Sequence, residues 1–254
     1  MNIDISNHAV SVVERGVYYY APQNYPRLTP REIKDILNFI AYEKSHGRQA
    51  AVLCNNEGIL QMLNSTNFAT IEDVPYCEFI YHATDLKAAN KILTSGNLLS
   101  ATEVYNKSGA QLAFEKNGSL WNDLPDYFEY IMFGWGDSEV GDYVVISENP
   151  DREKGDEFFA QGSCAGVRLY FRYADLLRHP GCTFDGYHPL KIQEKIVLSE
   201  YLYACIVPEQ YKGELNVLPE FAEKVHYLPQ IGLGISDWTK KCYNFVITRK
   251  VLHC

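Results

Sequence analysis

A histidine and a threonine lie where an apolar strand is expected to end and a short helix to begin. His82, Ala83 and Thr84 follow a run of apolar residues and precede Asp85. Aspartate is a preferred helix N-cap, and Gly96 is typical of a helix C-terminus. The apolar residues between Asp85 and Gly96 fall on one helical stripe. Polar side chains at such a strand end face a cleft, so they predict a ligand-binding site.

A glutamate at the start of a later strand could supply a carboxylate. Glu194 precedes the apolar segment 195–198, and a further strand is expected at 203–207. A carboxylate can stabilise positive charge in a transition state or activate an acceptor. Neither His82 nor Glu194 is diagnostic alone, because strand histidines are often structural and edge glutamates are usually solvated.

Together these segments resemble two motifs of the ADP-ribosyltransferase superfamily, in the branch that contains the poly(ADP-ribose) polymerases and the bacterial DNA-modifying toxins. The first motif is an apolar residue, an aromatic residue, His82, any residue and Thr84, followed by a short helix. The last motif is a glutamate that opens a strand, here Glu194. The resemblance covers residues 77–210 and departs from the family at Ala83, where glycine is usual.

The resemblance implies a split pair of antiparallel sheets with NAD in the cleft and release of nicotinamide. We expect no metal. His82 would hydrogen-bond the adenosine ribose, the backbone of Ala83 would hold the nicotinamide amide, and Thr84 would support the cofactor. Glu194 would bond the nicotinamide ribose and act at its anomeric carbon. Glu200 is the competing carboxylate if the register is shifted.

An aromatic side chain stacks on nicotinamide in this superfamily, and the candidates are Tyr130, Phe133 and Tyr143. The sequence does not choose among them, because aromatic residues at this density also build cores. Arg168 or Arg172 could pair with the cofactor diphosphate. The alternative for both arginines is an ion pair on a strand face.

The chain is acidic and has enough apolar residues for a substantial core. Its 254 residues carry a net charge of -9, and 46% of them are hydrophobic. This charge favours a protein or small-molecule acceptor, whereas resemblance to nucleobase-modifying toxins favours nucleic acid. We expect a protein acceptor. A local basic patch could still bind nucleic acid, and its candidate residues are Arg168, Arg172, Arg178, Lys191 and Lys195. The alternative is that these are scattered, solvated charges.

The cysteine spacing, the histidine spacing and the N-terminal sequence argue against a disulfide-rich protein, a metalloprotein and a membrane protein. The seven cysteines form no C-x-x-C pair, which argues against a disulfide framework and a zinc site. His179, Asp185 and His188 match no standard metal-ligand spacing, and 185–189 is typical of a turn. With neither a signal peptide nor a membrane-length apolar run, we expect a cytoplasmic protein, or an effector delivered by a dedicated secretion machine, without a membrane partner.

The N-terminal region is expected to form a helix and a strand beside the core. Thr29-Pro30-Arg31-Glu32 is a capping box that predicts a helix ending at His46-Gly47, and 49–54 is typical of a buried strand. Pro75 marks a boundary, but no linker composition separates the halves. We therefore predict a single domain 1–254 with an N-terminal elaboration (1–76), a catalytic core (77–210) and a C-terminal extension (211–254).

The core is expected to contain many short strands and few helices. Residues 108–117 indicate a loop or short helix, and strands are expected at 142–147 and 167–173. With the closing strands near 195–207, this pattern predicts an α+β fold with mainly antiparallel sheets.

These observations lead us to expect an NAD-dependent mono-ADP-ribosyltransferase with a macromolecular acceptor. An RNA 2′-phosphotransferase-like enzyme is an alternative on the same fold, but it would need several arginines and histidines in fixed places. The other alternative is a catalytically silent module that binds NAD, ADP-ribose or a protein partner. Glu194 distinguishes an enzyme from a binding module, because a binding module does not need that carboxylate.

Overall fold

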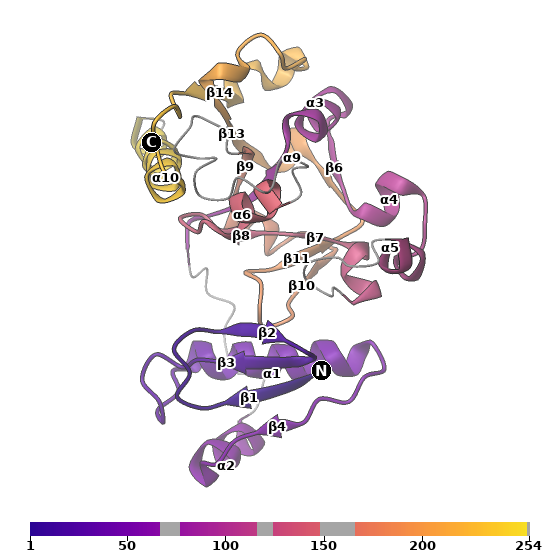
Figure 1. Ribbon diagram of the computed structural model, residues 1–254, viewed down its shortest axis with the longest axis vertical. Helices are drawn as coiled ribbons and strands as arrows, with labels where there is room; N and C mark the ends of the chain where they lie inside the picture. The colour runs from indigo at the N-terminus through magenta and orange to yellow at the C-terminus, as the bar shows by residue number, and fades with distance from the viewer. Residues whose placement is uncertain (67–76, 116–123, 148–165, 253–254) are drawn as a thin grey trace. The chain divides into compact units, whose positions relative to one another are not determined.

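The computed structural model describes residues 1–66, 77–115, 124–147 and 166–252. The chain divides into two units (Figure 1). Unit 1 comprises Met1–Val74 and Thr183–His188, and unit 2 comprises Pro75–Cys182 and Pro189–Cys254. Both units combine helices with sheets, so the predicted α+β class is confirmed.

Unit 1 contains a four-stranded sheet in the order β2-β3-β1-β4. Its strands are β1 (Asn2–Ile5), β2 (Val12–Glu14), β3 (Val17–Tyr20) and β4 (Val52–Leu53). Because β1 runs parallel to both β3 and β4, the expectation of mainly antiparallel pairing is wrong for this sheet. The strand predicted at 49–54 shrinks to two residues. The other three strands escaped prediction because segments of three or four residues carry little period-two signal.

Helix α1 (Pro30–Ser45) packs on this sheet and begins as predicted (Figure 1). The Thr29 hydroxyl accepts the Glu32 N–H (3.3 Å), and the Glu32 carboxylate accepts the Thr29 N–H (2.7 Å). Helix α2 (Glu57–Ser65) contributes to the same core. The buried apolar residues of this core are Ile3, Ile5, Tyr18, Tyr20, Ile33, Ile36, Phe39, Ile59 and Leu63.

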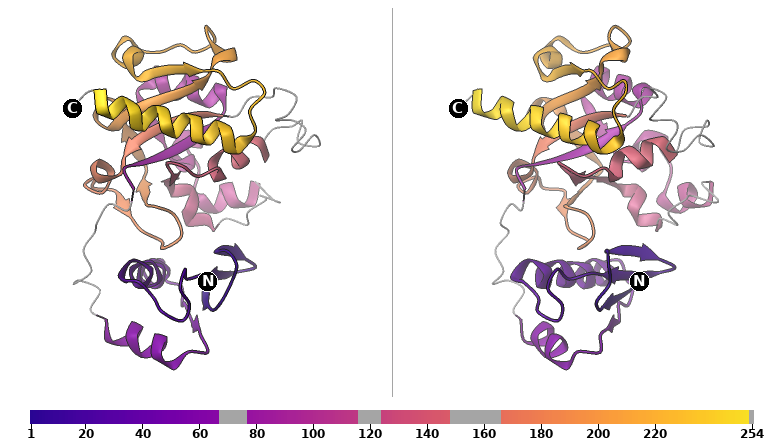
Figure 2. Two further views of the ribbon diagram at one scale, coloured as in Figure 1. Left: turned by 90° about the vertical axis from the view of Figure 1, so that its left-hand side faces the viewer. Right: turned by 60° about the vertical axis from the view of Figure 1, so that its left-hand side comes forward.

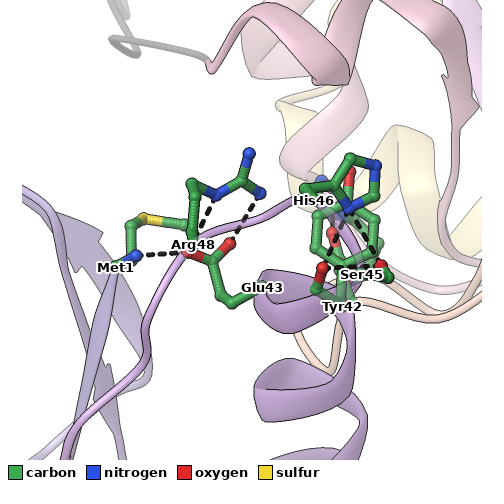
Figure 3. Close-up of polar contacts among 8 residues, drawn as sticks. Met1, Tyr42, Glu43, Ser45, His46 and Arg48 are labelled. Carbon is green, nitrogen blue, oxygen red and sulfur yellow. Dashed lines mark hydrogen bonds and ion pairs between the residues drawn. The ribbon is translucent and has the colours of Figure 1, made fainter.

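A buried carboxylate near the end of α1 is held by two cations (Figure 3). Glu43 is fully buried and pairs with the Met1 amino group and with Arg48, whose Nη2 lies 2.8 Å from Oε1. Burial opposes ionisation, but the hydrogen bonds from Arg48 and Met1 outweigh it, so the pKa of Glu43 is lowered.

Unit 2 is built on a five-stranded sheet in the order β14-β13-β9-β5-β8. Its strands are β5 (Phe79–Thr84), β8 (Gly134–Trp135), β9 (Val167–Arg172), β13 (Leu202–Pro208) and β14 (Val225–Leu228). Strand β9 is antiparallel to β5 and β13, whereas β13 and β14 are parallel. Helix α10 (Ile235–Leu252) crosses one face of the sheet, where it buries Trp238 (Figure 2).

Two smaller sheets, β10-β11-β7 and β12-β6, accompany the large one. Their strands are β6 (Asn97–Leu99), β7 (Tyr130–Met132), β10 (Cys182–Thr183), β11 (Lys191–Gln193) and β12 (Lys195–Val197). Helix α3 (Leu86–Ser95) connects β5 to β6 and confirms the predicted caps. The Asp85 carboxylate accepts the Ala88 N–H (2.6 Å), and Gly96 adopts a left-handed φ of 70°.

Short helices join the remaining segments, and the one expected within 108–117 is present as α5. They are α4 (Ala101–Tyr105), α5 (Gly109–Glu115), α8 (Tyr173–Leu176) and α9 (Leu198–Tyr201), with the 3₁₀ helices η2 (Pro125–Glu129), η4 (Glu209–Tyr211) and η5 (Pro219–Lys224). Within the described ranges, no helix has both the length and the apolar character needed to cross a bilayer.

The strand predicted at 142–147 is wrong, because these residues belong to helix α6 (Val140–Ser147). The Ser138 hydroxyl accepts the N–H of Val140 (3.2 Å) at the start of the helix. Asp142, one turn later, is buried against Arg168. The β-branched run favoured a strand, but these tertiary contacts override that propensity.

Candidate functional site

Burial decreases along β5 toward the residues that the sequence singled out. The first half of the strand, Phe79 to Tyr81, is fully buried. His82, Ala83 and Thr84 are half-buried. On the β8 side, the ladder pairs only Ile80 and Tyr81 of β5. The last three residues of β5 therefore have no strand partner on that side among the described residues.

His82 has a defined tautomer. Its Nδ1 lies 3.0 Å from the carbonyl oxygen of Met132 in β7. A carbonyl can only accept, so Nδ1 carries the proton and Nε2 is left as an acceptor. Within the described ranges, Nε2 has no hydrogen-bond partner. Burial lowers the pKa of His82, so the ring is neutral at physiological pH.

The three aromatic candidates occupy different environments. Phe133 lies in the core, with its ring edge-on to His82 at 6.3 Å and to Phe171 at 5.6 Å. Tyr130 is half-buried. Tyr143, on α6, is 48% exposed. Phe133 therefore supports the His82 ring from the core, and the two tyrosines are the better placed to meet a ligand.

The start of α6 lies directly on β5 near the candidate site. The Tyr81 hydroxyl donates to the Ser138 carbonyl (2.8 Å) and accepts the N–H of Gly141 (3.0 Å). A Cβ at Gly141 would lie only 3.0 Å from the Cβ of Ala83. A larger residue at this position would push its neighbours back by a few tenths of an ångström, so glycine favours the close approach that brings the helix carrying Tyr143 against the end of β5.

Arg168 holds α6 in place from within the core and does not present its charge to a ligand. Its side chain is fully buried, pairs with Asp142, and donates from Nη1 to the Tyr170 hydroxyl (3.0 Å) and from Nη2 to Thr239. The guanidinium also lies 4.3 Å from the Tyr81 ring centroid. The strand-face ion pair is therefore the correct interpretation for Arg168.

Glu194 occupies the single residue between β11 and β12, where the chain passes from one small sheet to the other. Its φ is 62°, in the left-handed region. Its N–H donates to the Glu129 carbonyl (3.0 Å), and its carbonyl accepts the Ser100 N–H (2.7 Å). Its side chain is exposed. A left-handed residue other than glycine costs about 1–2 kcal/mol, and such strain clusters at functional sites.

The last residue of β7 and the last residue of η2, which directly precedes β7, anchor the two predicted site residues. The carbonyl of Met132 holds the ring of His82, and that of Glu129 holds the backbone of Glu194. The neighbouring pair Tyr130 and Gln193 lies opposite in the β7–β11 ladder. The sequence predicted His82 and Glu194 but carried no signal for this shared anchor.

Other predicted candidates lie elsewhere. Glu200 is exposed on α9, beyond the end of β12. Lys191 is fully buried, with Nζ 3.9 Å from the Tyr127 ring centroid, so neither it nor Arg168 contributes to a basic surface patch. Asp185 and His188 bond to each other (2.8 Å) within unit 1.

No family model, curated protein or solved structure matches this chain. The functional assignment therefore depends on what the site can do chemically. A neutral imidazole with a free acceptor can bind a hydroxyl group. An exposed carboxylate on a strained, doubly anchored backbone can stabilise a cation.

Proposed function

We propose that this protein is an NAD-dependent mono-ADP-ribosyltransferase that transfers ADP-ribose to a macromolecular acceptor. The observation that carries the proposal is that His82 is bonded to Met132, the last residue of β7, and Glu194 to Glu129, the residue that precedes β7. The division of unit 2 into a five-stranded sheet and two small sheets supports it further, since the resembled superfamily holds NAD between split sheets.

His82 and its neighbours bind the substrate in this proposal. The Nε2 atom of His82 accepts a hydroxyl hydrogen from the adenosine ribose. The unpaired backbone at the end of β5 hydrogen-bonds the nicotinamide carboxamide near Ala83, with Thr84 beside it. Tyr130 or Tyr143 stacks on the nicotinamide ring.

Glu194 acts at the anomeric carbon of the second ribose. When the bond to nicotinamide breaks, its electron pair leaves with the ring nitrogen, which becomes neutral. The ribose gains positive charge, and the Glu194 carboxylate stabilises it. A nucleophilic atom of the acceptor then bonds this carbon and releases its proton to the carboxylate or to water.

Labelled NAD incubated with the protein and a cell lysate tests the proposal. We expect release of nicotinamide together with a covalent label on protein, because the net charge of -9 disfavours a nucleic acid acceptor. Mass spectrometry then identifies the modified atom. Label found only on nucleic acid would show that the acceptor is nucleic acid and not protein. If no lysate supports release of nicotinamide, the protein is not an ADP-ribosyltransferase.

A further inference from the structure

A small pocket lies beyond the C-terminal ends of two parallel strands, and its lining contains none of the residues of the proposed reaction. Strands β13 and β14 end side by side, with Pro208 opposite Leu228. The segments that follow them enclose a volume of about 190 Å³. Its lining residues are Glu209, Gln210, Pro229, Gln230 and Ile231.

Two glutamine side chains in this lining are joined by one hydrogen bond. The Nε2 of Gln210 donates to the Oε1 of Gln230 (2.8 Å), and Gln230 is fully buried. The other two amide atoms, Oε1 of Gln210 and Nε2 of Gln230, are buried and have no hydrogen-bond partner among the described residues. Unsatisfied buried amide atoms are unfavourable, so each of them calls for an explanation such as a bound water or ligand.

The pair keeps the same character whichever way the amides are oriented. If both were flipped, Gln230 would donate to Gln210, and one carbonyl and one amino group would again remain unpaired. Two residues that line the pocket thus leave one acceptor and one donor unpaired, on side-chain amides that are joined to each other by a hydrogen bond. A matching group must present a donor and an acceptor on the same side.

We propose that this pocket binds the side-chain carboxamide of an asparagine or glutamine in a protein partner. A trans peptide group points its N–H and C=O in opposite directions, a carboxylate lacks a donor, and an ammonium lacks an acceptor. A nucleobase edge has the required pattern, but the Glu209 carboxylate in the lining and the net charge of -9 disfavour a phosphodiester chain. Ile231, at 74% exposure, gives the rim an apolar surface that suits a protein.

This inference does not require NAD or transferase activity, and it can be tested by binding alone. The experiment follows the δ1-methyl signal of Ile231 by NMR in the full chain, titrated with acetyl-Gly-Gln-Gly-N-methylamide, its Glu counterpart, or uridine. The N-methylamide cap leaves the glutamine side chain as the only primary carboxamide in either peptide. The variants are Gln210→Met and Gln230→Met, which remove the amides while keeping length and apolar volume. Gln61→Met, on the exposed surface of α2, is the matched control.

We expect the glutamine peptide to shift the Ile231 signal with a Kd in the millimolar range and to bind at least about tenfold more tightly than the glutamate peptide. Both pocket variants should lose that preference, and Gln61→Met should keep it. Because the comparison of the two peptides uses the unmodified protein, it stands even if a variant fails to fold. Equal binding of both peptides, binding of uridine alone, or no shift at about 10 mM peptide, which indicates a bound water only, would overturn the proposal.

Discussion

His82 and Met132 are joined across two sheets by a hydrogen bond of 3.0 Å between an imidazole Nδ1 and a backbone carbonyl. The bond fixes the side chain in one tautomer and turns Nε2 into the acceptor. It also separates two roles of the histidine, since Nδ1 serves the fold and Nε2 serves the proposed ligand.

Two amide substitutions of His82 can separate these roles. In His82→Asn the amide nitrogen replaces Nδ1 and keeps the bond to Met132, whereas in His82→Gln the amide oxygen reaches the place of Nε2. We expect His82→Asn to stay folded and to bind NAD about tenfold more weakly, because one ligand hydrogen bond is lost. His82→Gln should retain more of the affinity but lower the free energy of unfolding by about 1 kcal/mol.

Calorimetric titration with NAD and urea unfolding measure these two effects. NAD should also raise the melting temperature of the unmodified protein. If His82→Asn and His82→Gln both bind NAD normally, His82 is a structural residue only.

Glu194→Gln should keep the fold and most of the NAD affinity but lose transfer by about a hundredfold to a thousandfold. The amide keeps the size of the side chain while removing the charge that stabilises the transition state. Nicotinamide release and label transfer report the rate. Glu200→Gln is the control, and it should have little effect because Glu200 lies on α9 beyond the strand. If Glu200→Gln loses activity and Glu194→Gln does not, Glu200 is the catalytic carboxylate and Glu194 is not.

The buried pair of Arg168 and Asp142 should be essential to the fold. Asp142→Asn leaves a guanidinium buried without its carboxylate, which typically costs about 3–5 kcal/mol. The double variant Arg168→Met with Asp142→Leu should recover much of that loss. Urea unfolding provides the free energies. Glu115→Gln, which breaks the exposed pair with Lys107, should change them by less than about 1 kcal/mol. A cost equally small for Asp142→Asn would contradict a structural role for the buried pair.

The parts of the fold that the sequence predicted are those coded by neighbouring residues. The capping box at Thr29 and the caps of α3 at Asp85 and Gly96 depend on contacts within a few positions. Helix α6 escaped prediction because its stability depends on Arg168, which comes from a distant strand. The left-handed backbone of Glu194 had no local signal either, since that position is usually occupied by glycine or asparagine.

Asp35 should make the stability of unit 1 depend on pH. Burial raises its pKa from 3.8 to about 7, which nearby Arg31 and Tyr20 only partly offset. The groups that face it are Tyr18, Tyr20, Arg31, Glu32 and Asp185. The folded state therefore binds more protons than the unfolded state between pH 4 and 7, and stability falls as the pH rises through this window.

Asp35→Asn should remove this dependence and stabilise unit 1 above pH 7. The gain is at most about 4 kcal/mol, because one pKa unit corresponds to about 1.4 kcal/mol, and it is reduced by the 27% exposure of the side chain. Amide hydrogen exchange in α1, corrected for intrinsic exchange rates, measures the stability of unit 1 at pH 6 and pH 8. Glu14→Gln, at an exposed position in β2, is the control and should show no such gain. A pH-independent protection of α1 in the unmodified protein would show that Asp35 stays ionised.

Glu194→Gly tests whether the strained backbone is kept for function. Glycine adopts a φ of 62° without steric cost, so the substitution should relieve about 1–2 kcal/mol of strain, of which the greater entropy of an unfolded glycine offsets about 0.5–1 kcal/mol. We expect the free energy of unfolding to stay constant or to rise, while transfer is abolished because the carboxylate is gone. Asn106→Gly, at a φ of 50° on the C-cap of α4, is the matched control and should leave transfer unchanged. Greater stability with lost activity would place Glu194 among residues that retain strain for chemistry. A clear loss of stability would instead mean that the Glu194 side chain supports the fold.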